Sequence, residues 1–99
     1  MADGRGQSGF SNVFQKPLAP YQQLTVTVLT NLTPPSGAGM ALITVEAQAV
    51  RWRDDGTAPT ATVGMPLAVG QSMSYFGDMT KIQFIAQVAG GIINVSYYR

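Results

Sequence analysis

The sequence predicts an all-β domain, an antiparallel β-sandwich that is jelly-roll-like and is preceded by an extended N-terminal arm. Six or seven short segments alternate apolar and polar residues with a period of two, and turn signals separate them about every eight to twelve residues. No segment carries an apolar stripe at helical spacing. Because parallel strands need long crossover connections, usually helices, we expect the strands to run antiparallel.

The chain is expected to divide into an arm of residues 1–21 and a sandwich domain of residues 22–99. The arm is rich in Gly, Ser and Gln, and its apolar residues follow neither the strand period nor the helix period. Pro17 and Pro20 oppose regular structure there, since proline lacks a backbone N–H and fixes its own φ.

Two large apolar side chains, Phe10 and Phe14, stand in this arm. A purely solvated tail rarely needs two phenylalanines, because water disfavours exposed apolar surface. We therefore expect a partner to order the arm, with both rings as anchors. The alternative interpretation is a disordered leader.

Two predicted strands open the sandwich. Residues 23–30 alternate Val26 and Val28 with threonines, and a loop rich in Pro and Gly follows them. Residues 41–53 form a longer segment whose apolar face switches near Val50, which predicts a bend or a β-bulge.

The second half of the chain continues with shorter segments of the same alternation. The predicted strands are residues 61–65, 70–76, 81–88 and 92–98. In the last two strands the residues expected to face inward are Ile82, Phe84, Ala86, Val88, Ile93, Val95 and Tyr97.

Charge is scarce in this chain of 99 residues: 11% are charged, and the net charge is +1. Ordinary soluble domains have about 25% charged residues, so a free monomer would be poorly protected against association. We expect other chains to cover much of the surface and predict a closed homo-oligomer, with a trimer favoured over a dimer. The small net charge argues against nucleic acid and anionic membrane as partners, and no stretch approaches the roughly 18 apolar residues of a membrane span.

The side chains needed for the usual enzyme chemistry are missing. The sequence has no cysteine and no histidine, which removes the commonest activated nucleophiles, general base and metal ligand. Asp54 and Asp55 are adjacent, so on an extended chain they point to opposite faces and cannot share a substrate. Glu46 is the only other acidic residue near them, which is too few for a calcium loop. The sequence therefore predicts no catalytic residues, no metal site and no cofactor.

The stretch RWRDDG, residues 51–56, reads as a strand that enters a turn. Arg51 and Arg53 share one face, with the two following aspartates close enough to neutralise them. Trp52 points to the opposite face, where a place in the core is favoured and contact with a neighbouring subunit is the alternative. Gly56 is expected to have a positive φ, which glycine adopts without steric cost.

The C-terminal half resembles a class of small virion structural proteins of tailed bacteriophages. The pattern is Arg-Trp-Arg-Asp-Asp-Gly, Pro-Thr, Gly-Met-Pro-Leu, Gly-Asp, Phe-Ile and a closing Asn-Val-Ser-Tyr-Tyr, found here at residues 51–56, 59–60, 64–67, 77–78, 84–85 and 94–98. The resemblance implies a minor capsid or decoration protein that binds the major capsid protein on the outside of the virion head. Such a protein is made in the cytoplasm of the bacterial host. The resemblance brings no catalytic residues.

A second hypothesis is a tail- or fibre-associated module that binds host glycan. In that case Trp52 and either Tyr97 or Tyr98 would stack on sugar rings beside polar groups. Across both hypotheses the candidate interaction residues are Phe10, Phe14, Arg51, Trp52, Arg53 and Tyr98.

Overall fold

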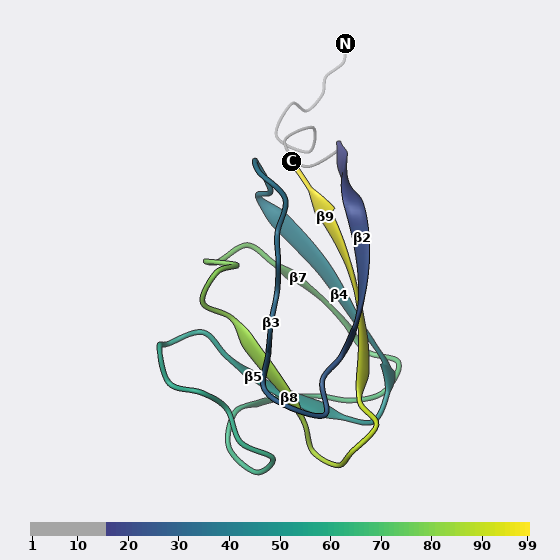
Figure 1. Cartoon of the computed structure of the whole chain (residues 1–99), viewed down its shortest axis with the longest axis vertical. Coiled ribbons are helices and arrows are strands. Elements are labelled where there is room, and N and C mark those ends of the chain that lie inside the picture. The colour runs from purple at the N-terminus through teal and green to yellow at the C-terminus, as the bar shows by residue number, and fades with distance from the viewer. Residues whose placement is uncertain (1–15) are drawn as a thin grey trace.

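The computed structural model describes residues 16–99, in which eight strands form two four-stranded antiparallel sheets and no helix occurs (Figure 1). One sheet has the strand order β2-β9-β4-β7 and the other has the order β3-β8-β5-β6. The strands are β2 (Pro17–Thr25), β3 (Thr30–Asn31), β4 (Met40–Ala47), β5 (Val50–Arg53), β6 (Met65–Leu67), β7 (Ser72–Tyr75), β8 (Gln83–Ala86) and β9 (Ile92–Tyr98). The all-β antiparallel class predicted from the sequence is confirmed.

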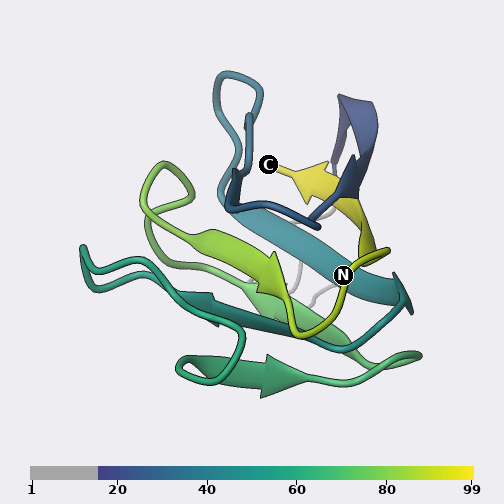
Figure 2. The ribbon, with the colours of Figure 1, turned by 60° about the horizontal axis from the view of Figure 1, so that its bottom comes forward.

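The strand pairing is nested. The first described strand pairs with the last, β2 with β9, and inside that pair come β3 with β8, β4 with β7 and β5 with β6. Two further pairings, β4 with β9 and β5 with β8, join these pairs into the two sheets. In Figure 2 the purple β2, the yellow β9 and the teal β4 lie side by side in one of them.

Because every pairing is antiparallel, successive turns alternate between the two ends of the sandwich. One end is formed by the turns at residues 26–29, 48–49, 68–71 and 87–91, and the other by those at 32–39, 54–64 and 76–82. In Figure 1 the C-terminus and the start of β2 lie at the top, and the turns at 26–29 and 87–91 lie at the bottom.

The core lies between the sheets and consists of the inward side chains of the alternating strands. The fully buried side chains are Tyr97, Phe84, Ile43, Ile82, Ile93, Val26, Val45, Val50 and Val95. Each contributes roughly 1.5–3 kcal/mol by leaving water, which makes this layer the main source of stability. Of the inward residues predicted for the last two strands, all are buried except Val88, which is exposed because β8 ends at Ala86 and the chain turns.

The boundary between arm and sandwich differs from the prediction. Strand β2 begins at Pro17, inside the range assigned to the arm, and it contains Pro20. The expectation that these prolines oppose a strand was wrong, because β2 is an edge strand bonded only to β9 and its register shifts between Leu18 and Gln22. Proline is tolerated at a sheet edge, where its missing N–H leaves no gap in a ladder. Phe10 and Phe14 lie outside the described residues.

Three other predicted strands have different limits. The segment 23–30 ends as a strand at Thr25, so Val28 is exposed and not inward. The segment 41–53 is two strands in different sheets, separated at Gln48, which has a φ of 58°. The predicted face switch is therefore a change of sheet. The segment 61–65 lies mainly in a loop, since β6 begins at Met65.

Candidate functional site

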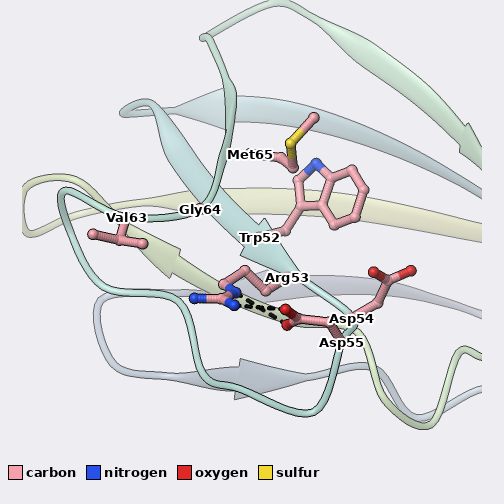
Figure 3. Close-up of a pocket in the computed structure, with 7 residues that line it drawn as sticks. All are labelled: Trp52, Arg53, Asp54, Asp55, Val63, Gly64 and Met65. Carbon is pink, nitrogen blue, oxygen red and sulfur yellow. Dashed lines mark hydrogen bonds and ion pairs between the residues drawn. The ribbon is translucent and has the colours of Figure 1, made fainter.

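The hairpin of β5 and β6 carries an open pocket of about 500 Å³ beside the long loop of residues 54–64. The lining residues are Trp52, Arg53, Asp54, Asp55, Val63, Gly64 and Met65 (Figure 3). Trp52 and Met65 are cross-strand partners and form an apolar wall, and the exposed Val63 adds a further apolar side chain to the lining. The charged residues form the polar part of the lining.

Arg51 fastens the loop to the strand. Its Nε donates to the carbonyl oxygen of Ala61 at 3.2 Å, and its Nη1 donates to that of Gly64 at 2.9 Å. Gly64 has a φ of +143°, and a Cβ there would lie 3.1 Å from the Cβ atoms of Arg51 and Pro59. The side chain of Arg51 is thus hydrogen-bonded to backbone carbonyl oxygens and not to a carboxylate. The expectation that Asp54 and Asp55 neutralise it was wrong.

Arg53 does pair with an aspartate as predicted. Its Nε donates to Oδ1 of Asp55 at 3.0 Å and its Nη2 to Oδ2 at 2.5 Å, a two-point contact that Figure 3 shows as dashed lines. The hydrogen bond from Arg53 is the main reason that the pKa of Asp55 lies below its ordinary value. The pair is open to solvent, which screens it, so its role is to shape the turn and not to supply much stability.

Asp54 has a different partner, which links the loop to the other sheet. The hydroxyl of Tyr75 donates to Oδ2 of Asp54 at 2.6 Å, and the ring of Tyr75 meets the indole of Trp52 edge to face with centroids 6.0 Å apart. Burial, followed by the hydrogen bond to Asp54, raises the pKa of Tyr75, which keeps its proton. This chain of contacts fixes the orientation of Trp52.

Trp52 stands on the core side of β5, opposite the arginines, as the sequence predicted. It packs against the core cluster but remains half-buried, and its indole forms part of the pocket wall. Gly56 has the predicted positive φ, at 89°. No local pattern predicts the pair of Asp54 and Tyr75, because Asp54 lies in the loop after β5 and Tyr75 ends β7 in the other sheet, so only folding brings them together.

The polar groups of the pocket are largely paired with one another, Arg53 with Asp55 and Asp54 with Tyr75. Within residues 16–99 no group of three His, Cys, Asp or Glu side chains is arranged to hold a metal ion. What the pocket offers is an apolar wall with a satisfied polar edge. Such a surface is suited to packing against an apolar side chain of another molecule.

The remaining candidate residues lie elsewhere. Tyr98 is half-buried on the outer face of β9, opposite Met40, in the sheet that does not contain Trp52. Tyr97 is buried, its hydroxyl donates to Oε1 of Gln22 at 2.5 Å, and burial raises its pKa to about 12. Tyr97 therefore cannot stack on a sugar. The structure brings Arg51, Trp52 and Arg53 together and leaves Tyr98 apart.

A second surface feature is the absence of charge at one end of the sandwich. The turns at 26–29, 48–49, 68–71 and 87–91, all within the described part of the chain, contain no Asp, Glu, Lys or Arg. The same turns expose large aliphatic side chains, namely Val28, Leu29, Val69 and Val88. We call this surface the uncharged end.

The opposite end, which we call the charged end, holds most of the ionic groups. Its turns carry Asp54, Asp55, Asp78 and Lys81, and Lys16 and Arg99 lie at the two ends of the described chain, joined by a backbone hydrogen bond of 2.9 Å. The two ends of one small sandwich therefore differ in charge, while exposed apolar side chains occur at both, Val63 and Phe76 being those in the turns of the charged end. Sequence reasoning missed this segregation because it depends on which turns the topology brings together.

No family model, curated protein or solved structure matches this chain. Among residues 16–99 there is no helix of the length and apolar character needed to cross a membrane.

Proposed function

We propose that this protein is a virion structural protein of a tailed bacteriophage, a minor capsid or decoration protein that binds the major capsid protein on the outside of the assembled head. It is made in the cytoplasm of the bacterial host. The observation that carries the proposal is the uncharged end, where four exposed aliphatic side chains stand in turns that contain no charged residue, as at a contact surface.

Burial of those side chains provides the driving force for attachment. Each Å² of apolar surface removed from water stabilises the contact by roughly 25 cal/mol. A protein with 11% charged residues also lacks the dense surface charge that keeps small monomers apart. Within residues 16–99, most of the charged residues lie at the other end. Attachment through the uncharged end leaves the charged end toward solvent.

The strand arrangement supports a jelly roll, the finer form of the predicted sandwich. Eight strands with nested pairing, β2 with β9 through β5 with β6, divided into two four-stranded sheets, correspond to that architecture. Jelly rolls occur in viral capsid and lectin domains. The residues that carry the phage resemblance at 51–56 and 64–67 build the β5–β6 hairpin and its loop, which is a structural role.

The mechanism is reinforcement by linkage. A protein that binds the assembled shell but not its free subunits shifts the equilibrium toward the shell. Repetition of the same contact by capsid symmetry turns a modest contact into a large total.

Insertion of a charge at the uncharged end tests the attachment. Each variant is added to phage heads that lack this protein. Val88→Asp and Val28→Asp should each lower the number of copies bound per head at least tenfold, because the contact would desolvate the aspartate. Val63→Asp is the matched control, since Val63 is 52% exposed and Val88 is 58% exposed, yet Val63 lies at the pocket. Loss of binding in the control alone would assign attachment to the pocket, and absence of the protein from purified virions would refute the proposal.

Self-association belongs to the same proposal. We expect a closed homo-oligomer, a trimer before a dimer, because a trimer fits the local three-fold positions of an icosahedral shell. Light scattering at micromolar concentration measures this, and a mass of 10.5 kDa, that of a single chain, would contradict it.

A further inference from the structure

The outer face of the sheet β2-β9-β4-β7 carries a continuous row of polar side chains. Gln23, Asn94, Thr44 and Ser72 are neighbours in register, one from each strand. Nε2 of Gln23 donates to Oδ1 of Asn94 at 3.1 Å, and the hydroxyls of Thr44 and Ser72 lie 3.0 Å apart. Strands are spaced about 4.8 Å apart, so this row extends over about 14 Å.

Glu46 extends this row and is the only charged residue in the four strands. Its Oε1 accepts hydrogen bonds from Nδ2 of Asn94 at 2.8 Å and from Nε2 of Gln23 at 3.1 Å. No cationic side chain of the described residues pairs with it, and its Oε2 accepts no hydrogen bond from them. A carboxylate held by two neutral amides keeps a fixed, open acceptor on the surface.

An exposed aromatic ring completes the arrangement. Tyr21 is 60% exposed, and its hydroxyl donates to Oδ1 of Asn94 at 2.5 Å, which ties the ring to the polar row. An aromatic ring anchored by its hydroxyl offers an apolar face without the entropy cost of a mobile side chain.

We propose that this face is a binding site for a neutral oligosaccharide. The apolar C–H face of one sugar ring stacks on Tyr21, and hydroxyls of the same ring donate to Oε2 of Glu46. Hydroxyls of the following rings exchange hydrogen bonds with the amides and hydroxyls of the row.

The charge of the site selects the class of ligand. The carboxylate of Glu46 repels an anionic glycan, and the four strands supply no Lys or Arg to bind one. The length of the row favours an oligosaccharide over a single sugar. The row lies in the sheet that does not contain Trp52, and it borders the uncharged end, since Ser72 follows the turn at 68–71 and Glu46 precedes that at 48–49. It shares no residue with those turns, so the inference does not depend on the proposed attachment to the head.

Isothermal titration of the full-length protein tests the proposal. The probes are linear neutral hexasaccharides of α1,4-glucose, β1,4-glucose, β1,4-N-acetylglucosamine and β1,4-mannose, and an oligogalacturonate is the anionic comparison. We expect at least one neutral probe to bind and the oligogalacturonate not to bind. Binding of no neutral probe, or tighter binding of the anionic one, overturns the proposal.

Variants locate the site. Tyr21→Ala and Glu46→Gln should each raise the dissociation constant for the bound probe at least tenfold while the thermal midpoint stays near that of the parent, since both side chains are on the surface. Val63→Ser, at the separate pocket, is the control and should bind as the parent does. Weaker binding in Val63→Ser with unchanged Tyr21→Ala would place the glycan at the pocket and overturn the proposal.

A second copy of the chain is the competing occupant of this face. Light scattering of Tyr21→Ala and Glu46→Gln distinguishes the two. An oligomer mass equal to that of the parent supports the glycan site, and a reduced mass assigns the face to self-association and refutes it.

Discussion

The two ends of the sandwich hold their turns in place with different kinds of hydrogen bond. At the charged end, side chains hold the turns: Arg51 binds the loop at residues 54–64, and Asp78 accepts hydrogen bonds from both the backbone N–H and the hydroxyl of Thr80. At the uncharged end, most of the hydrogen bonds that hold the turns join backbone groups, as in the bond from Gly70 N to the carbonyl of Val45.

The loops at 54–64 and 76–82 account for the difference. Some of their backbone donors and acceptors have no ladder partner and bind polar side chains, whereas the loop at 32–39 closes with backbone bonds, as from Gly39 N to the carbonyl of Tyr98. A short turn closes with one or two bonds between adjacent strands. The uncharged end therefore needs no charged residues for folding, and its aliphatic side chains stay available for contact with another surface.

The largest effect is expected from the loop of the charged end. Gly64→Val should destabilise the fold by about 3 kcal/mol, because the valine is strained at a φ of +143° and its Cβ is crowded by Arg51 and Pro59. Gly56→Val is the matched control, with a φ of +89° and no neighbour within 4 Å, and should cost about 1 kcal/mol. Urea unfolding measures both. Equal losses would mean that crowding around residue 64 relaxes freely.

The two adjacent aspartates should differ. Asp54→Ala should cost about 1 kcal/mol, because it leaves the part-buried hydroxyl of Tyr75 with only the carbonyl oxygen of Asp78, at 3.4 Å, and loosens the ring that packs on Trp52. Asp55→Ala should have a much smaller effect, since its pair with Arg53 is exposed. Near-ultraviolet circular dichroism of Trp52 should change in the first variant only. A larger loss in Asp55→Ala would reverse this assignment.

The uncharged end should respond to relief of strain. Gln48→Gly should stabilise the protein by about 0.5 kcal/mol, because a left-handed φ of 58° costs a non-glycine residue energy that exceeds the extra entropy of a glycine in the unfolded chain. Thermal unfolding, with Gln87→Gly as a control in the neighbouring turn, measures the gain. A loss of stability in Gln48→Gly would show that the Gln48 side chain makes a contact that stabilises the fold by more than the backbone strain destabilises it.

Lowering the pH should destabilise the charged end alone, and we expect this effect to be the smallest of the four. Hydrogen bonds, from Arg53 to Asp55 and from Thr80 to Asp78, hold both carboxyl pKa values below the ordinary 3.8. Their contribution to stability is therefore present above that value and is lost as the pH falls below about 4 through the lowered pKa values. Hydrogen exchange should accelerate in residues 54–64 and 76–82 but not in 87–91. Uniform acceleration would mean that the fold loosens as a whole.

Much of the strand pattern could be predicted from local sequence. The period of two located β4, β8 and β9 and the buried face of Ile93, Val95 and Tyr97, because burial on one face of a sheet forces that alternation. The strand through Pro17 and Pro20 could not be predicted in this way, since it depends on the edge position that β2 acquires only in the complete sheet.

The candidate site was only partly accessible to sequence reasoning. The turn at Gly56 and the pair of Arg53 with Asp55 are local and follow from the residue types. The contact of Asp54 with Tyr75 and that of Gln23 with Asn94 join residues far apart in the chain. Spacing carries no information about such contacts, because the strand order that creates them is a property of the whole fold.

The nested pairing also sets an order of events for folding. Among the nested pairs, β5 and β6 are separated by the shortest stretch of chain. Once they have paired, β4 and β7 are joined to them by short turns, and the same holds in turn for the pairs outside them, up to β2 and β9. Formed first, the outermost pair would have to close a loop of most of the chain, with a larger loss of entropy. We therefore expect the hairpin that contains Trp52 to be structured in the folding transition state and the pairing of the two chain ends to complete the process.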